Sequence, residues 1–446
     1  MKLNKNVIYI LNTLKKNNFS AYLVGGCVRD CIMKKEPHDF DICTNAKPDE
    51  IIKVFKKKQL LLHGMKHGTV TIVLNKECYE VTTFRIDGEY SDNRRPKEVF
   101  FTNNLTEDLS RRDFTINAIA YDYKFEDPFN GLTDIKNKVI RCVGNPEDRF
   151  NEDALRILRA LRFSSVLGFS IEENTKKAIF KLYKNLENIS WERINSEFSK
   201  LLLGQNSINV LREFAEVFFF LIPELKKCDK FNQNNKYHIH DVWEHTLHVL
   251  EYTPNDLILK LTALFHDVGK PDTYVLGEDG QGHFYEHPKK SAELSEEILV
   301  RMRYSNNIKN NVVSLILEHS ITFDVNKRFL RRCLSKLGEE NTKKLFILRK
   351  ADIIGQKGLE EATERLKKVD DIILLLEEVL EEQHCFKITD LELKGRDLIQ
   401  LGVPQGEEIG VILNNLFEAV INGAVKNDKS ELTDYAYKNN FIPIGE

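Results

Sequence analysis

The spacing of hydrophobic residues changes along the chain and predicts two kinds of structure. In roughly the first 143 residues, short runs rich in Val, Ile, Thr and Tyr alternate with helical patterns and glycine turns. Three such runs predict strands, at 21–26, 68–74 and 78–84. Beyond them the spacing is almost entirely that of helices, as in 152–163. The pattern predicts an α+β fold, with a mixed-sheet head followed by helical domains.

Two amphipathic segments indicate which residues enter a core. Near the N-terminus, Val7, Ile10, Leu11 and Leu14 recur at helical spacing between polar residues. In 152–163 the leucines and the isoleucine recur in the same way. We expect one helix over each segment, with these apolar positions buried.

Composition restricts the class of protein. A chain of 446 residues is long enough for roughly two to four domains. Its 65 basic and 68 acidic residues give a net charge of -3, so any nucleic-acid surface must be a local cluster of Arg and Lys. The longest apolar run, 217–222, is far shorter than the roughly 20 residues of a membrane span, and the eight cysteines form no CxxC pair. We therefore expect a cytoplasmic protein with reduced thiols and no membrane partner.

Changes in pattern and composition divide the chain into four segments. Strand patterns end near residue 143, and eight of the twelve histidines lie between His238 and His319. A helix rich in Glu and Lys follows Gly358. We predict a head, a helical neck and body, a histidine-rich domain and a helical tail, at 1–143, 144–236, 237–356 and 357–446.

The head carries a glycine turn and a pair of carboxylates. A predicted strand runs into Gly25 and Gly26 and then a helix with Arg29, and Asp39 and Asp41 follow on another strand. Strand alternation places both carboxylates on one face, where they repel unless a divalent cation binds between them. Mg²⁺ binds through carboxylates and substrate phosphates, while the glycine amides approach a triphosphate with Arg29 as its charge partner. The arrangement predicts Mg²⁺-dependent nucleotidyl transfer.

A third carboxylate, Glu80, lies on another predicted strand of the same sheet. It either completes the metal site or is an exposed strand residue. The sequence leaves these two interpretations equally supported.

Five ordered segments together resemble one family, the class II tRNA nucleotidyltransferases and bacterial poly(A) polymerases. They are LVGGCVRD (23–30), DFDI (39–42), RRDFTINAIA (111–120), DPFNGLTDI (127–135) and EDALRILRALRF (152–163). The resemblance implies the nucleotidyltransferase sheet of the DNA polymerase β superfamily and a two-metal reaction. It also implies addition of nucleotides from CTP and ATP to the 3′ end of tRNA, with release of pyrophosphate and without a nucleic-acid template.

A stripe of charged residues in 152–163 suits a site that accepts only C and A. Asp153, Arg156, Arg159 and Arg162 recur every third residue on the predicted helix. Cytosine and adenine both present an amino donor beside a ring-nitrogen acceptor, so a carboxylate beside a guanidinium matches them. The resemblance assigns this role to Asp153 and Arg156, while Arg159 and Arg162 hold phosphates or the helix itself.

The resemblance gives roles to further residues of the head. It places Arg112 at the nucleotide with Asn117 nearby, and it implies that Asp113 recognises the ribose hydroxyls. The segment 127–135 either supports rearrangement between C and A addition or is a structural turn. The segment 83–101 resembles a flexible loop that enzymes restricted to CC addition lack, so we expect full CCA addition or addition of the final A.

Six residues of the histidine-rich segment form a second candidate site. Imidazoles with carboxylates suit Zn, Mn, Fe, Ni or Mg. The order of these residues resembles the HD phosphohydrolase superfamily, which implies that a metal-activated water attacks a phosphoester near Lys270. The core set and the extra pair of binuclear members are His245, His266, Asp267, Asp352, His287 and His319.

The HD segment is either a working hydrolase or a helical scaffold that has lost its activity. For a working hydrolase, we expect the substrate to be a 2′,3′-cyclic phosphate or a terminal phosphate on a damaged tRNA end. We interpret the remaining histidines of the segment as surface or packing residues, namely His238, His240, His248 and His283. In the tail, Lys394 and Arg396 either bind the tRNA backbone or are solvated residues at a helix start.

Three alternatives stay open beside an enzyme that adds CCA or its final A to tRNA. The first is a poly(A) polymerase. The second is a regulatory HD phosphohydrolase of signalling nucleotides with a degenerate head, and the third is an RNA chaperone without catalysis. We also consider a homodimer formed through the helical domains.

Overall fold

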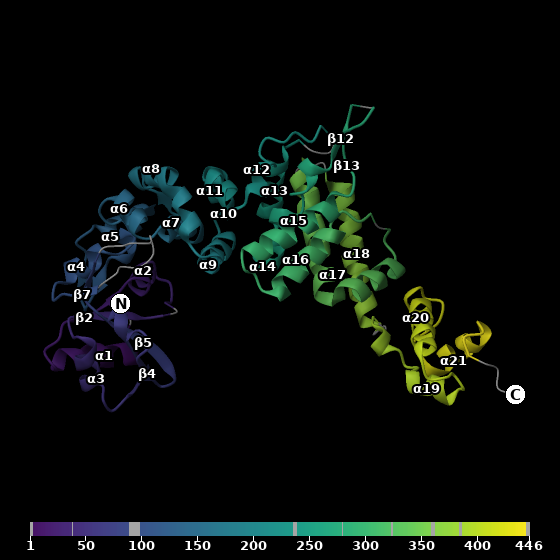
Figure 1. Ribbon diagram of the computed structural model, residues 1–446, viewed down its shortest axis with the longest axis horizontal. Coiled ribbons are helices and arrows are strands. Elements are labelled where there is room, and N and C mark those ends of the chain that lie inside the picture. The colour runs from purple at the N-terminus through teal and green to yellow at the C-terminus, as the bar shows by residue number, and fades with distance from the viewer. Residues whose placement is uncertain are drawn as a thin grey trace. The chain divides into compact units, whose positions relative to one another are not determined.

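The computed structural model divides the chain into two compact units, Met1–Leu221 and Ile222–Glu446 (Figure 1). The division falls inside the segment 144–236, so the part of that segment after Leu221 belongs to the second unit. The structure describes residues 3–37, 39–88, 99–234, 239–278, 280–322, 324–357, 362–382 and 386–442.

A seven-stranded mixed sheet forms the centre of the head, in the order β3-β4-β5-β2-β1-β8-β9. Its strands are β1 (Ala21–Val24), β2 (Asp41–Thr44), β3 (Gln59–Leu61), β4 (Thr69–Leu74), β5 (Glu77–Thr83), β8 (Ala120–Tyr121) and β9 (Phe125–Glu126). Strands β2 and β5 are parallel, and the other neighbouring pairs are antiparallel. The three predicted strands and the mixed sheet are confirmed.

The register of the sheet places Asp41 between Val24 of β1 and Glu80 of β5. Strand β2 begins at Asp41, so the prediction that Asp39 lies on the same strand is wrong. The reason is that β1 ends at Val24, where the chain turns away, and no residue of β1 continues the pairing beside Asp39.

Short helices and strand pairs complete the head. The helices are α1 (Lys5–Lys16), α2 (Gly26–Ile32), α3 (Pro48–Val54), η1 (Met65–His67), α4 (Leu105–Ser110), η2 (Thr115–Asn117) and α5 (Gly131–Asn137). The strand pair β6 (Arg85–Asp87) and β7 (Val99–Phe101) borders the expected flexible loop, whose residues 89–98 lie outside the described part of the chain.

Helix α1 shows why its sequence folds as predicted. The Asn4 side chain accepts from the Asn6 N–H and caps its start, while Lys15 and Lys16 lie at its negative end. The predicted apolar face, Val7, Ile10, Leu11 and Leu14, is fully buried. Helix α1 packs against β1 and α3, so one face of the sheet is covered at the N-terminus.

Six helices follow the sheet within the first unit. They are α6 (Pro146–Glu152), α7 (Leu155–Leu167), α8 (Glu173–Leu182), α9 (Trp191–Leu202), α10 (Ser207–Glu213) and α11 (Ala215–Leu221), with η3 (Tyr183–Asn188) and the pair β10 (Val139–Ile140) and β11 (Ser170–Ile171) between them. Helix α7 packs against α9 and α10, and its leucine positions are buried as predicted.

The single helix predicted over 152–163 is wrong at its start. Helix α6 ends at Glu152, Asp153 is extended with φ −143° and ψ 103°, and α7 begins at Leu155. The Asp153 carboxylate accepts from the Leu155 N–H at 3.1 Å and so satisfies a free donor of the new helix. Asp153 fits the helical spacing of the sequence, but in the structure it caps the start of α7 instead of continuing α6.

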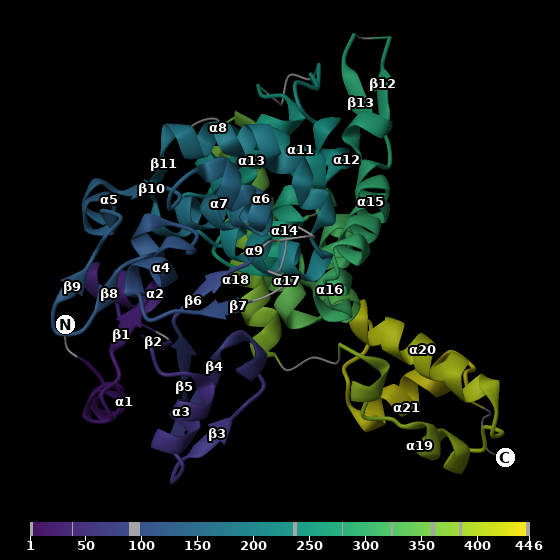
Figure 2. The same cartoon turned by 60° about the vertical axis from the view of Figure 1, so that its left-hand side comes forward.

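The second unit is almost entirely helical, as the pattern predicts. Its helices are α12 (Pro223–Lys226), α13 (Val242–Tyr252), α14 (Leu257–Phe265), η4 (Lys270–Asp272), α15 (His287–Arg301), α16 (Asn306–Glu318), α17 (Lys327–Lys357) and α18 (Thr363–Glu381). Helix α17 packs against α13, α16 and α18, and Gly338 with φ 75° interrupts it. The hairpin β12 (Tyr274–Leu276) and β13 (Gly282–Phe284) projects from these helices (Figure 2).

The tail helices form a small core of their own. They are η5 (Ile388–Asp390), α19 (Gly395–Gln400), α20 (Glu407–Ile421) and α21 (Lys429–Lys438). Leu393, Leu398, Leu416 and Leu432 are fully buried within this core. The tail is therefore folded by its own apolar residues, next to the helical group that carries the histidines.

Replacing Gly131 by Ala should destabilise the first unit by about 1–3 kcal/mol. An added Cβ would lie 2.2 Å from the Thr115 carbonyl oxygen and 2.8 Å from the Ile119 side chain. Gly410→Ala is the matched control, because its Cβ meets nothing within 4 Å and helix α20 gains a better helix former. Urea unfolding followed by circular dichroism measures both, and an unchanged midpoint for Gly131→Ala would contradict the packing described.

Candidate functional sites

Gly25 brings the first turn of the head against two charged side chains. Its φ of 77° and ψ of −141° lie outside the range of other residues. A Cβ at this position would lie 3.3 Å from Arg112 Nη1 and 3.5 Å from Asp41 Oδ2. The turn therefore needs glycine for its conformation, and its backbone lies against a guanidinium and a carboxylate.

Three carboxylates act on one another at the edge of this turn. Asp41 and Glu80 are direct neighbours on parallel strands. Burial raises the pKa of Asp41, the Arg112 guanidinium opposes this, and the charge of Asp39 raises it further. Burial raises the pKa of Glu80 as well, followed by the charges of Asp41 and Asp39. The structure thus places negative charge where a divalent cation would relieve repulsion. Glu80 is exposed on β5, and its role as a metal ligand stays a prediction.

Arg29 is buried and links three parts of the head. Its Nη1 donates to Asn117 Oδ1 at 2.8 Å, and its Nε and Nη2 donate to Asp30 Oδ1 at 2.9 and 2.7 Å. Its guanidinium also lies 5.0 Å from the centre of the Phe163 ring of α7. A Cβ on Gly26 would lie 3.5 Å from Arg29 Nη2. Arg29 therefore orients the turn, and its expected contact with a triphosphate stays a prediction.

A cavity of about 280 Å³ lies between the head and α7. Five of its residues come from the predicted nucleotide-binding set, contributed by two segments about 40 residues apart in the chain. Three others were not predicted. The lining residues are Arg111, Arg112, Asp113, Asp153, Leu155, Arg156, Arg159 and Arg193.

The two residues expected to read the base lie in this cavity with different partners. The Asp153 carboxylate pairs with Arg193 Nη2 of α9 at 2.7 Å. Arg156 Nη1 donates to Glu152 Oε2 at 2.5 Å, and its Nη2 donates to the Arg111 carbonyl at 3.0 Å. Both side chains are thus held in place by protein contacts at the wall of the cavity.

Arg193 is a candidate site residue that sequence reasoning missed. Its Nη1 is buried and has no hydrogen-bond partner in the described part of the chain. In the sequence it is one charge among several on an amphipathic helix, and only the packing of α9 against α7 reveals its partner. The donor left over at Nη1 suits an acceptor that enters the cavity.

Asp113 and two arginines of α7 hold the head to the helices. Asp113 Oδ2 accepts from Arg159 Nε at 2.8 Å and Nη2 at 2.6 Å, and Asp113 Oδ1 accepts from Asn117 at 3.1 Å. Arg162 Nε lies 2.6 Å from Glu197 Oε2 of α9. Recognition of ribose by Asp113 stays a prediction, while the structural role of Arg159 and Arg162 is visible in these ion pairs.

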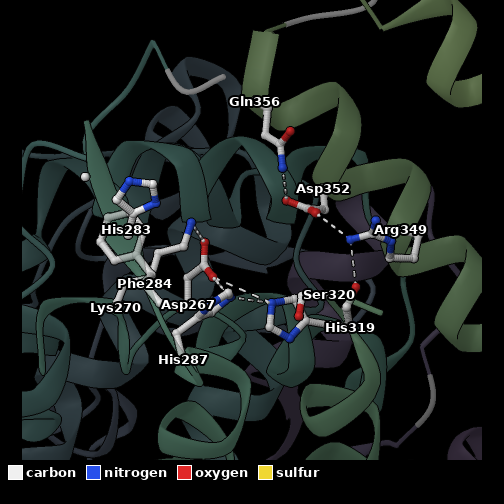
Figure 3. Close-up of a pocket in the computed structure, with 11 residues that line it drawn as sticks. Asp267, Lys270, His283, Phe284, His287, His319, Ser320, Arg349, Asp352 and Gln356 are labelled. Atoms are coloured by element: carbon white, nitrogen blue, oxygen red, sulfur yellow. Dashed lines mark hydrogen bonds and ion pairs between the residues drawn. The ribbon is translucent and has the colours of Figure 1, made fainter. Parts of the chain in front are cut away.

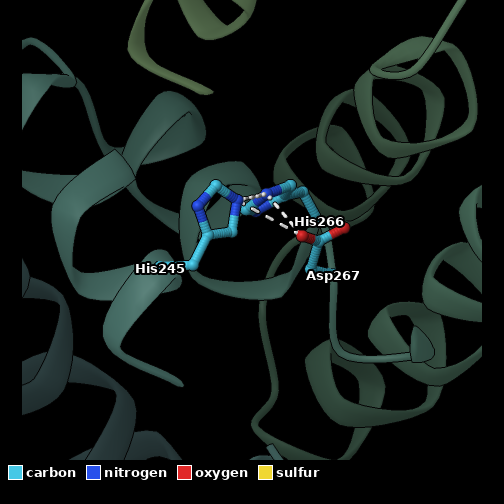
Figure 4. A group of neighbouring side chains, drawn as sticks. All are labelled: His245, His266 and Asp267. Carbon is cyan, nitrogen blue, oxygen red and sulfur yellow. Dashed lines mark hydrogen bonds and ion pairs between the residues drawn. The ribbon is translucent and has the colours of Figure 1, made fainter. Parts of the chain in front are cut away.

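In the second unit, His245, His266 and Asp267 form a buried group (Figure 4). The Nε2 atoms of the two histidines are 3.3 Å apart, and Asp267 Oδ2 lies 3.4 Å from His245 Nε2 and 3.2 Å from His266 Nε2. Asp352 Oδ1 lies 3.2 Å from His245 Nε2. These are the four residues predicted as the core of the second site.

Asp267 also belongs to a second group with His287 and His319. The Nε2 atoms of these histidines are 3.3 Å apart, and Asp267 Oδ1 lies 3.4 Å from His287 Nε2 and 3.7 Å from His319 Nε2. Asp267 Oδ1 is buried without a hydrogen-bond donor in the described residues. One carboxylate with an oxygen toward each histidine pair fits two bound metal ions that share a bridging ligand.

Backbone carbonyls fix the orientation of all four imidazoles. Each Nδ1 faces a carbonyl oxygen, which turns each Nε2 into the group, where it could bind a metal ion. The distances from Nδ1 are 3.3 Å for His245 to Gly355, 2.8 Å for His266 to Ala263, 3.0 Å for His287 to Phe284 and 2.6 Å for His319 to Ile316. The chemistry of these donors fits a transition metal or Mg²⁺.

A cavity of about 250 Å³ opens onto Asp267, and cations lie on both sides of it (Figure 3). Lys270 Nζ lies 2.6 Å from Asp267 Oδ2 and 2.8 Å from Gln233 Oε1. Arg349 donates to the His319 carbonyl at 2.8 Å and lies 3.3 Å from Asp352 Oδ2. The cavity therefore combines metal-ligand chemistry with positive charge, which suits a phosphate.

Three family models match successive segments of the chain. Residues 21–141 match the family described as the Poly A polymerase head domain, residues 168–228 match a probable RNA- and SrmB-binding site of polymerase A, and residues 237–355 match the HD domain. A CCA-adding enzyme of Oceanobacillus iheyensis is 34% identical over 436 residues, which cover 96% of each chain. This chain belongs to the CCA-adding enzyme family.

Solved structures of CCA-adding enzymes share the fold. The Bacillus stearothermophilus enzyme in complex with CTP has a TM-score of 0.70 at 27% identity, covering 97% of this chain and 96% of the other. The Thermotoga maritima enzyme complexed with tRNA has a TM-score of 0.59 at 19% identity, covering 98% and 96%. Membership confirms the resemblance predicted from the five segments and makes the chain a member of a nucleotidyltransferase family.

The remaining predictions have mixed outcomes. His240 and His248 stack on each other with ring centres 4.3 Å apart, away from the metal-ligand groups, and His238 lies outside the described residues. His283, expected to be a surface or packing residue, lines the HD cavity. None of the helices in the described part of the chain has the length and apolar content needed to span a bilayer.

The tail residues and the segment 127–135 have structural contacts. Lys394 Nζ donates to the Thr389 carbonyl at 2.8 Å at the start of α19, and Arg396 is exposed on that helix. Asp127 accepts from the Gly131 N–H at 2.7 Å at the start of α5. These contacts do not separate the structural from the functional interpretation of either segment.

Asp113 should make the first unit sensitive to acid. Burial opposes ionisation, but Arg159 and the other donors outweigh it and lower the pKa of Asp113 from 3.8 to about 2. The stabilisation is therefore complete above the ordinary pKa and is lost as the pH falls through about 2, which corresponds to about 2 kcal/mol. The difference in unfolding free energy between wild type and Asp113→Asn should shrink accordingly from pH 5 downward, and a constant difference would contradict it.

Proposed function

We propose that this chain adds the 3′-terminal CCA to tRNA from CTP and ATP without a nucleic-acid template. The observation that supports this most directly is the cavity whose wall carries Arg112, Asp153 and Arg156. Arg112 Nη1 also lies against the Gly25 turn, 3.3 Å from the position of an added Cβ. The names of the full-length relatives support the same substrate. The groups proposed for catalysis and those proposed for base selection come from distant segments of one compact unit.

Asp39, Asp41 and Glu80 would hold Mg²⁺, which activates the attacking hydroxyl and supports the leaving group. The 3′ oxygen of the tRNA attacks the α-phosphorus, the bond from that phosphorus to the bridging oxygen breaks, and pyrophosphate leaves. The hydroxyl proton passes to water. Arg112, beside Gly25, is placed to balance the charge of the triphosphate.

The base is selected by hydrogen bonds that uracil and guanine do not match. Asp153 accepts from the exocyclic amine of C or A, and Arg156 donates to the ring nitrogen. The ion pair with Arg193 holds the Asp153 carboxylate in the wall of the cavity, where its oxygens can accept from the base. Lys394 and Arg396 are the proposed contacts to the tRNA backbone, and a homodimer through the helical domains stays a prediction.

Primer extension distinguishes CCA addition from addition of the final A and from poly(A) synthesis. With Mg²⁺, CTP and ATP, transcripts of tRNA that end before CCA, after C and after CC should all be extended to CCA and then stop. Asp41→Asn should reduce extension to background, because the shared cation loses a ligand beside Glu80. Asp49→Asn, an exposed carboxylate in α3, is the matched control and should retain activity.

Each other product pattern would replace the proposal with a defined rival. Extension of the CC-ended transcript alone identifies an A-adding enzyme, and a long A ladder identifies a poly(A) polymerase. Absence of any extension by a folded protein would support an RNA chaperone or a regulatory protein with a degenerate head.

We further propose that the HD domain hydrolyses a phosphate ester at an RNA end. The shared carboxylate of Asp267 carries this second proposal, because it presents one oxygen to each histidine pair. The metal ions held there supply an activated water. The water oxygen attacks phosphorus, the ester P–O bond breaks, and the leaving alcohol takes up a proton. Lys270 and Arg349 flank the phosphate.

RNA ending in a 2′,3′-cyclic phosphate or a 3′-phosphate tests the HD proposal. Protein loaded with Mg²⁺, Mn²⁺, Co²⁺, Ni²⁺ or Zn²⁺ should open the ring or release phosphate, because water is activated between the ligands. The double variant His266→Ala/Asp267→Ala should lose this activity and its bound metal, while primer extension persists.

His248→Ala is the matched control for this experiment, since His248 lies outside both ligand groups. Hydrolysis that survives in the double variant would end the proposal. Hydrolysis of free signalling nucleotides but not of RNA ends would favour the regulatory alternative.

A further inference from the structure

The β12–β13 hairpin forms one wall of the HD cavity and has two different faces. On one face, Tyr274 and Phe284 pair across the strands with ring centres 5.6 Å apart. Phe231 packs edge-on against Tyr274 at 5.5 Å, and Lys270 Nζ lies 5.3 Å from the Phe284 ring centre. This face therefore anchors the hairpin to the domain and helps to position Lys270.

The other face is aromatic and open to solvent. The rings of His283 and Tyr285 are nearly parallel, with an interplanar angle of 13° and centres 5.6 Å apart. Tyr285 is 65% exposed, and Val275, which pairs directly with His283, is 50% exposed. An exposed aromatic surface of this kind costs hydrophobic free energy unless something packs on it.

His283 connects this surface to the metal-ligand site. It lines the same cavity as Asp267 and His287 (Figure 3). A ligand whose phosphate lies at Asp267, between Lys270 and Arg349, would therefore extend its remaining part along the hairpin. A flat, apolar-faced group joined to a phosphate ester matches both surfaces, and a nucleoside has this chemistry.

We propose that His283 and Tyr285 are a stacking platform for a nucleobase and make the HD site specific for phosphate esters of nucleosides. The proposal rests on the phosphohydrolase activity proposed above and names the part of the substrate that this activity recognises. Stacking reads the π-face of a base, which all four bases share, so the platform accepts any terminal nucleotide. The hairpin thus recognises the nucleoside part of the substrate, while the rest of the cavity binds the phosphate.

The test compares two esters of secondary alcohols, 3′-AMP, which carries a nucleoside, and glycerol 2-phosphate, which carries neither a sugar ring nor a base. The metal-loaded full-length protein should hydrolyse 3′-AMP with the higher kcat/KM. Tyr285→Leu keeps apolar area but removes the ring, and it should lower this preference about tenfold, mainly through KM. Tyr285→Phe should retain the preference, because the ring remains.

Leu276→Ala is the matched control, since Leu276 is 59% exposed on the same hairpin but does not belong to the stacked pair. Equal kcat/KM for both esters in wild type, or an unchanged preference in Tyr285→Leu, would overturn the platform while leaving the hydrolase intact.

If neither ester is hydrolysed, the hydrolase proposal fails. A binding measurement then tests separately whether His283 and Tyr285 bind a nucleobase. Calorimetry with the head saturated by CTP compares AMP with ribose 5-phosphate in wild type, Tyr285→Leu and His266→Ala/Asp267→Ala. Tighter binding of AMP that is lost in both variants supports the platform. Equal affinity for the two ligands overturns it.

Discussion

The ion pair between Asp113 and Arg159 is the interaction on which the nucleotide site depends. A buried carboxylate costs several kcal/mol unless a cation and further donors compensate it. Asp113 has both, and the Asn117 amide that also binds it receives a hydrogen bond from Arg29 at its oxygen. A continuous set of contacts therefore runs from the Gly25 turn to α7, so the segment that carries Arg156 is held at a defined distance from the carboxylates proposed to bind Mg²⁺.

The same constraint, a buried carboxylate compensated by nearby cations, operates at the HD site. Asp267 and Asp352 are buried, and burial alone would raise their pKa, but neighbouring histidines and, for Asp267, Lys270 keep the pKa of both well below the ordinary value. For His245 burial opposes protonation, yet the two carboxylates outweigh it and raise its pKa to about 9. Metal ions would replace these protons, since the imidazoles are already oriented by backbone carbonyls.

The two proposed activities are chemically complementary. Nucleotide addition needs a free 3′ hydroxyl on the RNA, and hydrolysis of a terminal phosphate ester produces one. A platform that recognises any base suits ends at which the terminal nucleotide varies, whereas the head must recognise C and A. The two proposed sites therefore use different side chains. An aromatic ring such as Tyr285 stacks on any base, whereas a carboxylate such as Asp153 forms hydrogen bonds that only some bases match.

The sequence by itself determined the family, three strands of the head and the buried face of α1, and it named the residues proposed as metal ligands, because spacing along one element and ordered motifs are local properties. It did not determine that β2 begins at Asp41 or that Asp153 lies between two helices, since strand pairing and capping decide those boundaries. Only the tertiary structure paired Arg193 with Asp153 and placed His283 in the HD cavity. These residues come from elements whose packing depends on contacts distant in sequence, and no local pattern records which side chains such packing brings together.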